Sequence, residues 1–232
     1  MLEIQSDIAS KINVKVYKKN PLTSTLGKRI LSGTIYLMSE IGFEDFTFKK
    51  LSDAINSTEA TIYRYFENKH NLLTYLTMWY WSWLQHKCFL KTINIKSPQK
   101  RLENVIVAIT EPVTLDNQFD YIDEVRLNQI VITESTKVYR CKKVDKDNKD
   151  GFFLSYKELV EAAAEIVLEI DAKYAFPHML VSTVIEGAHH QRFFAEHLPR
   201  LTNINKEGDS ISEFFIQLVK NELKIYISSI AS

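Results

Sequence analysis

Apolar residues recur every three or four positions along most of the chain, which is the spacing of one face of an α-helix. The first clear run lies between Ser24 and Gly42. Ser24 or Thr25 is placed to cap the start of this helix, and Gly42 is placed to end it in a left-handed conformation. Further helices are predicted over 69–90, 98–111, 119–134, 152–174, 177–197 and 210–228, and two short ones lie within 47–66. The pattern therefore predicts an all-α protein with about nine helices.

Two segments depart from the helical spacing. Residues 12–17 alternate between apolar and polar positions, which predicts a short strand or an extended arm. Residues 141–151 include seven charged residues among eleven, which predicts a surface loop. The sequence Ser210-Ile211-Ser212-Glu213 has the form of a capping box and predicts the start of the last helix.

Composition narrows the class of protein. Only 6 Gly and 5 Pro occur in 232 residues, so long helices with few breaks are expected. The 29 basic and 29 acidic residues balance, which excludes a wholly basic nucleic-acid coat and an acidic tail. The two cysteines are too few for a disulfide framework. No secretory signal or membrane-spanning run is visible, so we expect a cytoplasmic protein without a membrane partner.

The segment 47–66 has the form of a helix-turn-helix. Thr47 can cap a first helix, Asn56 tolerates the turn geometry, and Ser57 or Thr58 can cap a second helix. In such a unit the outer side of the second helix faces the major groove of DNA. The residues expected on this side are Thr58, Glu59, Thr61, Tyr63 and Arg64. The alternative is a short helical corner in an ordinary bundle.

Residues 25–73 resemble the DNA-binding domain of TetR-family transcriptional regulators. The similarity lies in Gly42-Phe43 after the first helix, Thr47 before the second, and the run Thr61-Ile62-Tyr63-Arg64-Tyr65-Phe66-Glu67-Asn68-Lys69 followed by Leu72-Leu73. The resemblance implies that Tyr63, Tyr65 and Lys69 hold phosphates. It also implies that Thr58, Glu59, Thr61 and Arg64 lie at or near base edges, and Thr47 and Lys49 complete the expected DNA-binding set.

The chain departs from the family pattern in the turn and at the start of the second helix. A turn glycine is replaced by Asn56, a buried valine by Ser57 and a basic residue by Glu59. Glu59 repels phosphate but can accept a hydrogen bond from a cytosine amino group. Residues 11–50 hold eight basic and three acidic residues, a local charge of +5, which can compensate. The lysines of residues 11–19 fit a DNA-contacting arm and a solvated arm equally well.

The resemblance implies three parts: an arm over 1–22, a DNA-binding domain over 23–68, and an effector-binding and dimerisation domain over 69–232. It implies a homodimer on a double-stranded DNA operator, with the helices 177–197 and 210–228 pairing with their symmetry mates. The expected centre of that interface is Phe193, Phe194, Phe214, Phe215 and Leu218. The expected function is a transcriptional regulator, a repressor released by a small-molecule effector.

An aromatic stretch after His70 offers a candidate effector site. The predicted ligand-binding residues are Trp79, Trp83, His86, Arg126, Glu186 and His190. Arg126 is expected to orient the ligand, because a guanidinium on an apolar helix needs a partner. The competing interpretations are core packing for the aromatic residues and an ion pair of Arg126 with Asp123 or Glu186.

Other chemistry is weakly supported by the sequence. Glu67-x-x-His70 and Glu186-x-x-His189 have the ligand spacing of di-iron bundles, but further carboxylate helices are not evident. No catalytic triad or phosphate loop is apparent, so we expect no enzyme, no metal site and no cofactor. Two alternatives remain: the same fold controlled by a protein partner or by no effector, and a helical-bundle metalloenzyme.

Overall fold

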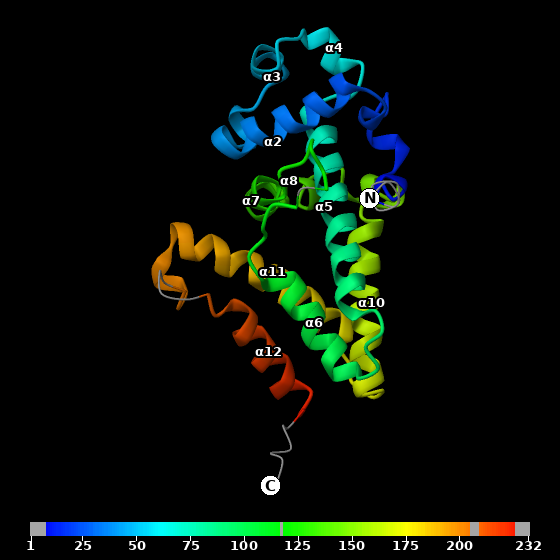
Figure 1. The fold of residues 1–232 in the computed structure, drawn as a ribbon, viewed down its shortest axis with the longest axis vertical. Helices are drawn as coiled ribbons and strands as arrows, with labels where there is room; N and C mark the ends of the chain where they lie inside the picture. The colour runs from blue at the N-terminus through cyan, green and yellow to red at the C-terminus, as the bar shows by residue number, and fades with distance from the viewer. Residues whose placement is uncertain (1–7, 117, 205–208, 226–232) are drawn as a thin grey trace. The chain divides into compact units, whose positions relative to one another are not determined.

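The structure, a computed structural model, describes residues 8–116, 118–204 and 209–225. These residues form α-helices and short 3-10 helices and no strand, so the predicted all-α fold is confirmed (Figure 1). The helices are α2 (Thr25–Asp45), α3 (Phe48–Ala54), α4 (Glu59–Tyr63), α5 (Lys69–Thr92), α6 (Pro98–Thr110), α7 (Glu124–Glu134), α8 (Thr136–Tyr139), α9 (Val144–Lys149), α10 (Leu154–Ile170), α11 (Pro177–His197) and α12 (Ile211–Glu222). The 3-10 helices are η1 (Val14–Val16), η2 (Pro21–Thr23) and η3 (Pro199–Leu201).

The chain divides into two compact units. Unit 1 contains Met1–Trp83 and Val113–Tyr156, and unit 2 contains Leu84–Pro112 and Lys157–Ser232. The predicted boundaries after residues 22 and 68 do not coincide with these units. The reason is that α2 packs along α7, which joins the first part of the chain to a segment far away in sequence (Figure 1).

Unit 1 is built around α2, which contacts α3 as well as α7, while α3 packs on α4. Ile30 and Leu31 of α2, Leu51 of α3 and Ile62 of α4 are fully buried, and the first half of α5 adds residues from Leu72 to Trp79 to the core. Ser24 caps α2 by accepting a hydrogen bond from the backbone N–H of Gly27, as predicted. A continuous apolar core therefore fixes the short helices α3 and α4 against the long α2.

In unit 2, α6, α11 and α12 pack on one another, and Ala163 and Val167 of α10 lie beside them. Helix α6 contacts both α11 and α12, which also contact each other. Ser97 caps α6 and Pro98 occupies its first position, as predicted from the sequence. Pro177 likewise opens α11.

The structure corrects three local predictions. Residues 12–17 form no strand or extended arm, because Ile12 and Val16 are buried and Val14–Val16 form η1. The charged segment 141–151 is not only a loop, since it contains α9. Ser210 does not form the predicted side-chain cap of α12; the carboxylate of Asp209 instead accepts from the backbone N–H of Ile211 at 3.1 Å.

The predicted break of the first helix at Gly42 is confirmed. Its φ is +73° and its ψ is 169°, which is not helical, and a second short helical stretch then continues to Asp45. Such a backbone conformation favours glycine because a side chain there is strained. Among the described residues, none of the helices combines the length and the apolar character that crossing a membrane requires.

Candidate functional site

The helix-turn-helix is shaped by caps and by one turn residue. Thr47 caps α3 by accepting from the backbone N–H of Lys50 at 3.1 Å, and Thr58 caps α4 by accepting from the backbone N–H of Thr61 at 3.3 Å. Between the helices, Asn56 adopts a φ of +48°, a conformation that asparagine tolerates better than most residues. The local sequence therefore sets both the length of the helices and the sharp turn between them.

The outer side of α4 and its flanks is open to solvent. Thr58, Tyr63 and Arg64 are exposed, and Glu59 and Thr61 are half-buried. The ring of Tyr63 packs edge-on against Phe48 with 4.9 Å between the ring centres, and the hydroxyls of Thr58 and Thr61 are 2.9 Å apart. Three of the five predicted groove-facing residues are therefore exposed, and the other two are partly covered.

Some of the neighbouring lysines already form hydrogen bonds or ion pairs within the protein, and others are exposed. Lys49 pairs with Asp53 at 3.0 Å, and the hydrogen bond with this carboxylate raises the pKa of Lys49 above its ordinary value. Both side chains are exposed, so this pair contributes little to stability and can exchange for another anion. The Nζ of Lys50 donates to the backbone carbonyl of Asp45 at 2.8 Å. Lys18 and Lys19 are exposed.

Two residues that the resemblance assigns to phosphates are turned inward. Tyr65 is 3% exposed, and its hydroxyl is 2.8 Å from the hydroxyl of Ser24. This hydrogen bond lowers the pKa of the Tyr65 phenol. The Nζ of Lys69 donates to the backbone carbonyls of Phe43, Glu44 and Phe46 at 2.9, 3.0 and 3.1 Å. Both side chains therefore hold the helix-turn-helix to its surroundings and do not lie on its outer side.

The predicted effector residues do not form one site within either unit. Trp79, Trp83 and Arg126 belong to unit 1, whereas His86, Glu186 and His190 belong to unit 2. Trp79 is 1% exposed and packs edge-on against Phe119 with 5.0 Å between the ring centres, as expected for a core residue.

The guanidinium of Arg126 binds side chains of the protein and is not available to a ligand in this structure. Its guanidinium pairs with Glu40 at 2.5 Å and with Asp123 at 3.5 Å, and it donates to the hydroxyl of Ser39 at 2.8 Å. It also lies over the ring of Tyr36, 4.8 Å from the centre. Arg126 therefore binds α7 to α2, and the ion pair with Asp123 that the sequence left open is formed.

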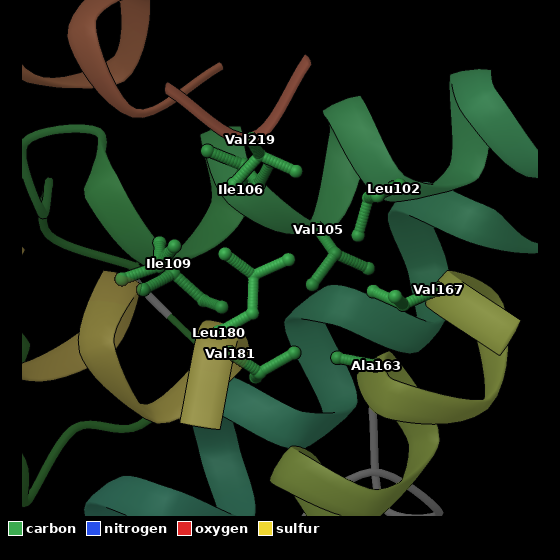
Figure 2. A pocket seen from close by; sticks show the side chains of 10 residues that line it. Leu102, Val105, Ile106, Ile109, Ala163, Val167, Leu180, Val181 and Val219 are labelled. Atoms are coloured by element: carbon green, nitrogen blue, oxygen red, sulfur yellow. The ribbon is translucent and has the colours of Figure 1, made fainter. Parts of the chain in front are cut away.

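A small cavity lies within unit 2, and none of the six predicted effector residues lines it. It is lined by side chains of α6, α10, α11 and α12, all of them apolar (Figure 2). They are Leu102, Val105, Ile106, Ile109, Ala163, Val167, Leu180, Val181, Val184 and Val219. The free volume is about 10 Å³, which is the room that one water-sized sphere needs. In this conformation the cavity is therefore too small for a ligand larger than a water molecule.

The helix-turn-helix segment is similar to a known protein family. A family model described as bacterial regulatory proteins of the tetR family matches residues 30–76. Residues 30–76 are therefore similar to the DNA-binding domain of that family. The match covers α2 from Ile30, the helix-turn-helix and the first turns of α5. Comparison with curated proteins gave no match.

Solved structures show that the TetR-like fold extends over most of the chain. AibR in complex with isovaleryl coenzyme A and operator DNA is 14% identical, with 83% of this chain and 95% of that chain covered and a TM-score of 0.57. A bacterial regulatory protein in the tetR family from Rhodococcus RHA1 is 11% identical, covering 87% and 97%, with a TM-score of 0.59. The ketosteroid transcriptional regulator KstR2 of Mycobacterium tuberculosis is 12% identical, covering 84% and 90%, with a TM-score of 0.52.

The TetR-like C-terminal helices present only part of the predicted dimer set at the surface. Phe214 is 52% and Leu218 is 37% exposed, and they lie four residues apart on one side of α12. Phe193 and Phe194 of α11 are half-buried. Phe215 is buried and packs on Gly187, where an added Cβ would lie 2.7 Å from its ring. Phe215 therefore joins α12 to α11 within the chain.

The sequence did not reveal the residues that hold the end of α2 in the TetR-family domain. The backbone N–H of Phe43 donates to Glu134 at 3.0 Å, and Lys137 pairs with Glu134 at 2.7 Å and with Glu44 at 3.0 Å. The hydrogen bond from Lys137 holds the pKa of the Glu44 carboxyl below its ordinary value. The three-residue spacing of Glu134 and Lys137 is visible in the sequence, but the contact of Glu134 with Phe43, 91 positions away, is not.

Proposed function

We propose that this chain is a sequence-specific DNA-binding transcriptional regulator that acts as a homodimer and is released from its operator by an apolar small molecule. One observation carries the DNA-binding part. A helix-turn-helix that matches the TetR family presents Thr58, Tyr63 and Arg64 on its exposed outer side. These are side chains that donate to or pack against base edges and phosphates.

The charge distribution supports binding at this end of unit 1. Arg64 is exposed, and Lys18, Lys19, Lys49 and Lys50 are exposed nearby in sequence. Phosphate contacts release bound counterions, so the affinity for duplex DNA should fall steeply as the salt concentration rises. Glu59 is expected to weaken non-specific binding and to add discrimination through a base donor.

The test begins with genomic DNA fragments retained by the purified protein, which are sequenced to find a shared motif. Arg64→Ala should then lower the ratio of specific to non-specific affinity by about tenfold or more, because one good base contact is worth roughly 1–3 kcal/mol. Lys96→Ala, which removes an exposed lysine of unit 2, serves as the matched control and should leave the ratio unchanged. An equal loss on all sequences would assign Arg64 to the phosphate backbone.

The homodimer is proposed from the geometry of reading DNA. A single short helix such as α4 reads only a few base pairs, and a two-fold dimer places two such helices about 34–36 Å apart, one turn of the duplex. Phe214 and Leu218 give α12 an exposed apolar side of the kind that a symmetric interface buries. Phe193 and Phe194 of α11 remain candidates for the same interface.

The effector is proposed from the cavity of unit 2. Its lining carries no polar side chain, so the part of a ligand that it holds should be a hydrocarbon group. AibR, which shares the fold, was solved with isovaleryl coenzyme A, and short branched acyl groups are therefore the first compounds to test. Such a ligand would act by favouring one arrangement of the dimer over another. We further propose that the operator-bound protein represses transcription and does not activate it.

Two other functions predict different results. A regulator controlled by a protein partner, or by no effector, should bind its operator equally well with and without acyl compounds. A helical-bundle metalloenzyme should show a metal-dependent reaction and no operator. Failure to retain any DNA sequence would overturn the regulator proposal itself.

A further inference from the structure

Three side chains of different chemistry meet at the start of α5, within unit 1. His70 is the second residue of α5, Cys141 follows α8, and Asp147 lies in α9. One potential ligand atom from each lies within 4.8 Å of the other two. In the part of the chain that the structure describes, this is the group of His, Cys, Asp or Glu side chains that is placed to hold a metal ion.

The separations suit a tetrahedral ion. Zinc bonds of about 2.0–2.3 Å to nitrogen, oxygen and sulfur place neighbouring ligand atoms about 3.3–3.8 Å apart. The Nε2 of His70 and the Oδ2 of Asp147 are 3.4 Å apart. This distance is longer than the roughly 2.7–2.9 Å of a charge-assisted hydrogen bond. The pair is therefore spaced like two ligands of one ion. The sulfur of Cys141 lies within 4.8 Å of both atoms, and its thiol donates to the backbone carbonyl of Val138 at 3.4 Å, a weak contact that a metal ion would replace.

Burial and charge also suit a divalent ion. The side chains of His70 and Asp147 are 21% and 9% exposed, and Cys141 is half-buried. A buried carboxylate is costly unless it is paired or binds a metal. One thiolate, one carboxylate and one neutral imidazole around a divalent cation give a site with no net charge. Imidazole and thiolate ligands select zinc-like ions over magnesium and calcium, which prefer oxygen.

We propose that His70, Cys141 and Asp147 form a binding site for Zn²⁺ or a divalent ion of similar chemistry, with a water molecule as the fourth ligand. His70 and Asp147 are separated by 77 residues in the sequence, so the ion would link two distant segments of unit 1. His70 directly follows Lys69, whose Nζ holds the last turn of α2 through three carbonyls. The ion would therefore fix the first turn of α5 where the helix-turn-helix ends.

The test uses Co²⁺ as a spectroscopic probe on the untagged full chain, because a thiolate bound to tetrahedral Co²⁺ gives a strong charge-transfer absorption in the near ultraviolet. We expect this band to saturate at one Co²⁺ per chain and to disappear when Zn²⁺ is added. Cys141→Ser should abolish the band, and His70→Asn should weaken Co²⁺ binding by at least about tenfold. Zn²⁺ should raise the melting temperature of the unmodified chain and of neither variant.

Two variants serve as matched controls. Cys88→Ala removes the other cysteine, which is buried in unit 2, where burial raises the pKa of the thiol to about 12 and keeps it protonated. His178→Asn removes an exposed histidine that pairs with Glu161. Both should keep the band and its stoichiometry. Absence of a thiolate band in the unmodified chain, or an unchanged band in Cys141→Ser, would overturn the proposal, and circular dichroism confirms that each variant is folded.

Discussion

Lys69 ties three backbone carbonyls at the end of α2 to the start of α5. A charged donor that serves three acceptors is a stronger link than a single surface ion pair. Its ammonium also lies over the ring of Phe43, 4.5 Å from the centre. The family resemblance assigns Lys69 to DNA phosphates. In this structure, however, its ammonium group already donates three hydrogen bonds to backbone carbonyls of the protein.

Lys69→Ala is therefore predicted to lower the free energy of unfolding by about 1–2 kcal/mol, because the carbonyls lose a charged donor. Urea unfolding measures this loss, and Lys96→Ala is the control for removing a lysine. The slope of DNA affinity against salt should stay the same, since no phosphate contact is lost. A slope reduced by about one, with unchanged stability, would return Lys69 to the phosphate role.

Glu124 is a buried carboxyl at the start of α7. It is 1% exposed, and its Oε2 accepts from the backbone N–H of Asp116 at 3.2 Å. Burial raises the pKa of the Glu124 carboxyl to about 7. The folded protein therefore holds a proton there between about pH 4.5 and 7 that the unfolded chain releases, so stability should decrease as the pH rises through this range.

Glu124→Gln should remove this pH dependence. The amide keeps an acceptor for the N–H of Asp116 and carries no charge, so the variant should be more stable than the unmodified chain at pH 8 by about 1–3 kcal/mol. The difference should shrink toward pH 5. Chemical unfolding at several pH values measures both curves, and parallel curves would show that the pKa of Glu124 is the same in the folded and unfolded states.

At the scale of elements, the sequence predicted where a helix starts wherever a capping residue or a proline marks its first turn. Ser24, Ser97 and Pro177 mark starts that the structure has within one residue. Segments whose structure depends on distant partners were not predictable. The charged segment that contains α9 became helical with Asp147 buried beside His70, and no local pattern reports such a contact.

The candidate sites divide in the same way. The outer side of α4 was predictable, because the caps and the turn fix which side of a short helix faces out. The cavity of unit 2 was not, because its lining comes from four helices whose apolar residues look like ordinary core positions. Of the proposed metal-ligand group, local spacing pointed only to His70, through Glu67-x-x-His70. Cys141 and Asp147 lie in separate segments, so no local pattern pairs them with His70.

The cavity between α6, α10, α11 and α12 is the proposed effector site, and filling it should prevent ligand binding. Ala163→Val adds two methyl groups to the lining and should abolish the rise in melting temperature that a branched acyl compound causes, while operator binding is kept. Ala162→Val is a closely matched control, because Ala162 is the exposed neighbour on the same helix. Fluorescence anisotropy of labelled operator measures release. Equal release from both variants would place the effector elsewhere.

At the scale of the whole molecule, the proposed homodimer requires a stable monomer fold and a surface that binds a second copy. The two neighbouring phenylalanines of α12 illustrate the division. Phe215 is buried on Gly187 within the chain, whereas Phe214 is 52% exposed. Substitution of Phe215 should therefore affect folding, and substitution of Phe214 should affect association.

Phe214→Glu is predicted to convert the protein to a monomer, because a charge in an apolar symmetric interface faces its own copy across the two-fold axis and is left without a partner. Analytical ultracentrifugation measures the change, and Gln217→Glu places the same charge at another exposed position of α12. The melting temperature of the monomer fold should change little. Operator affinity should fall far more than affinity for an isolated half-site, since the second recognition helix is no longer tethered. A Phe214→Glu protein that sediments as a dimer would remove α12 from the interface.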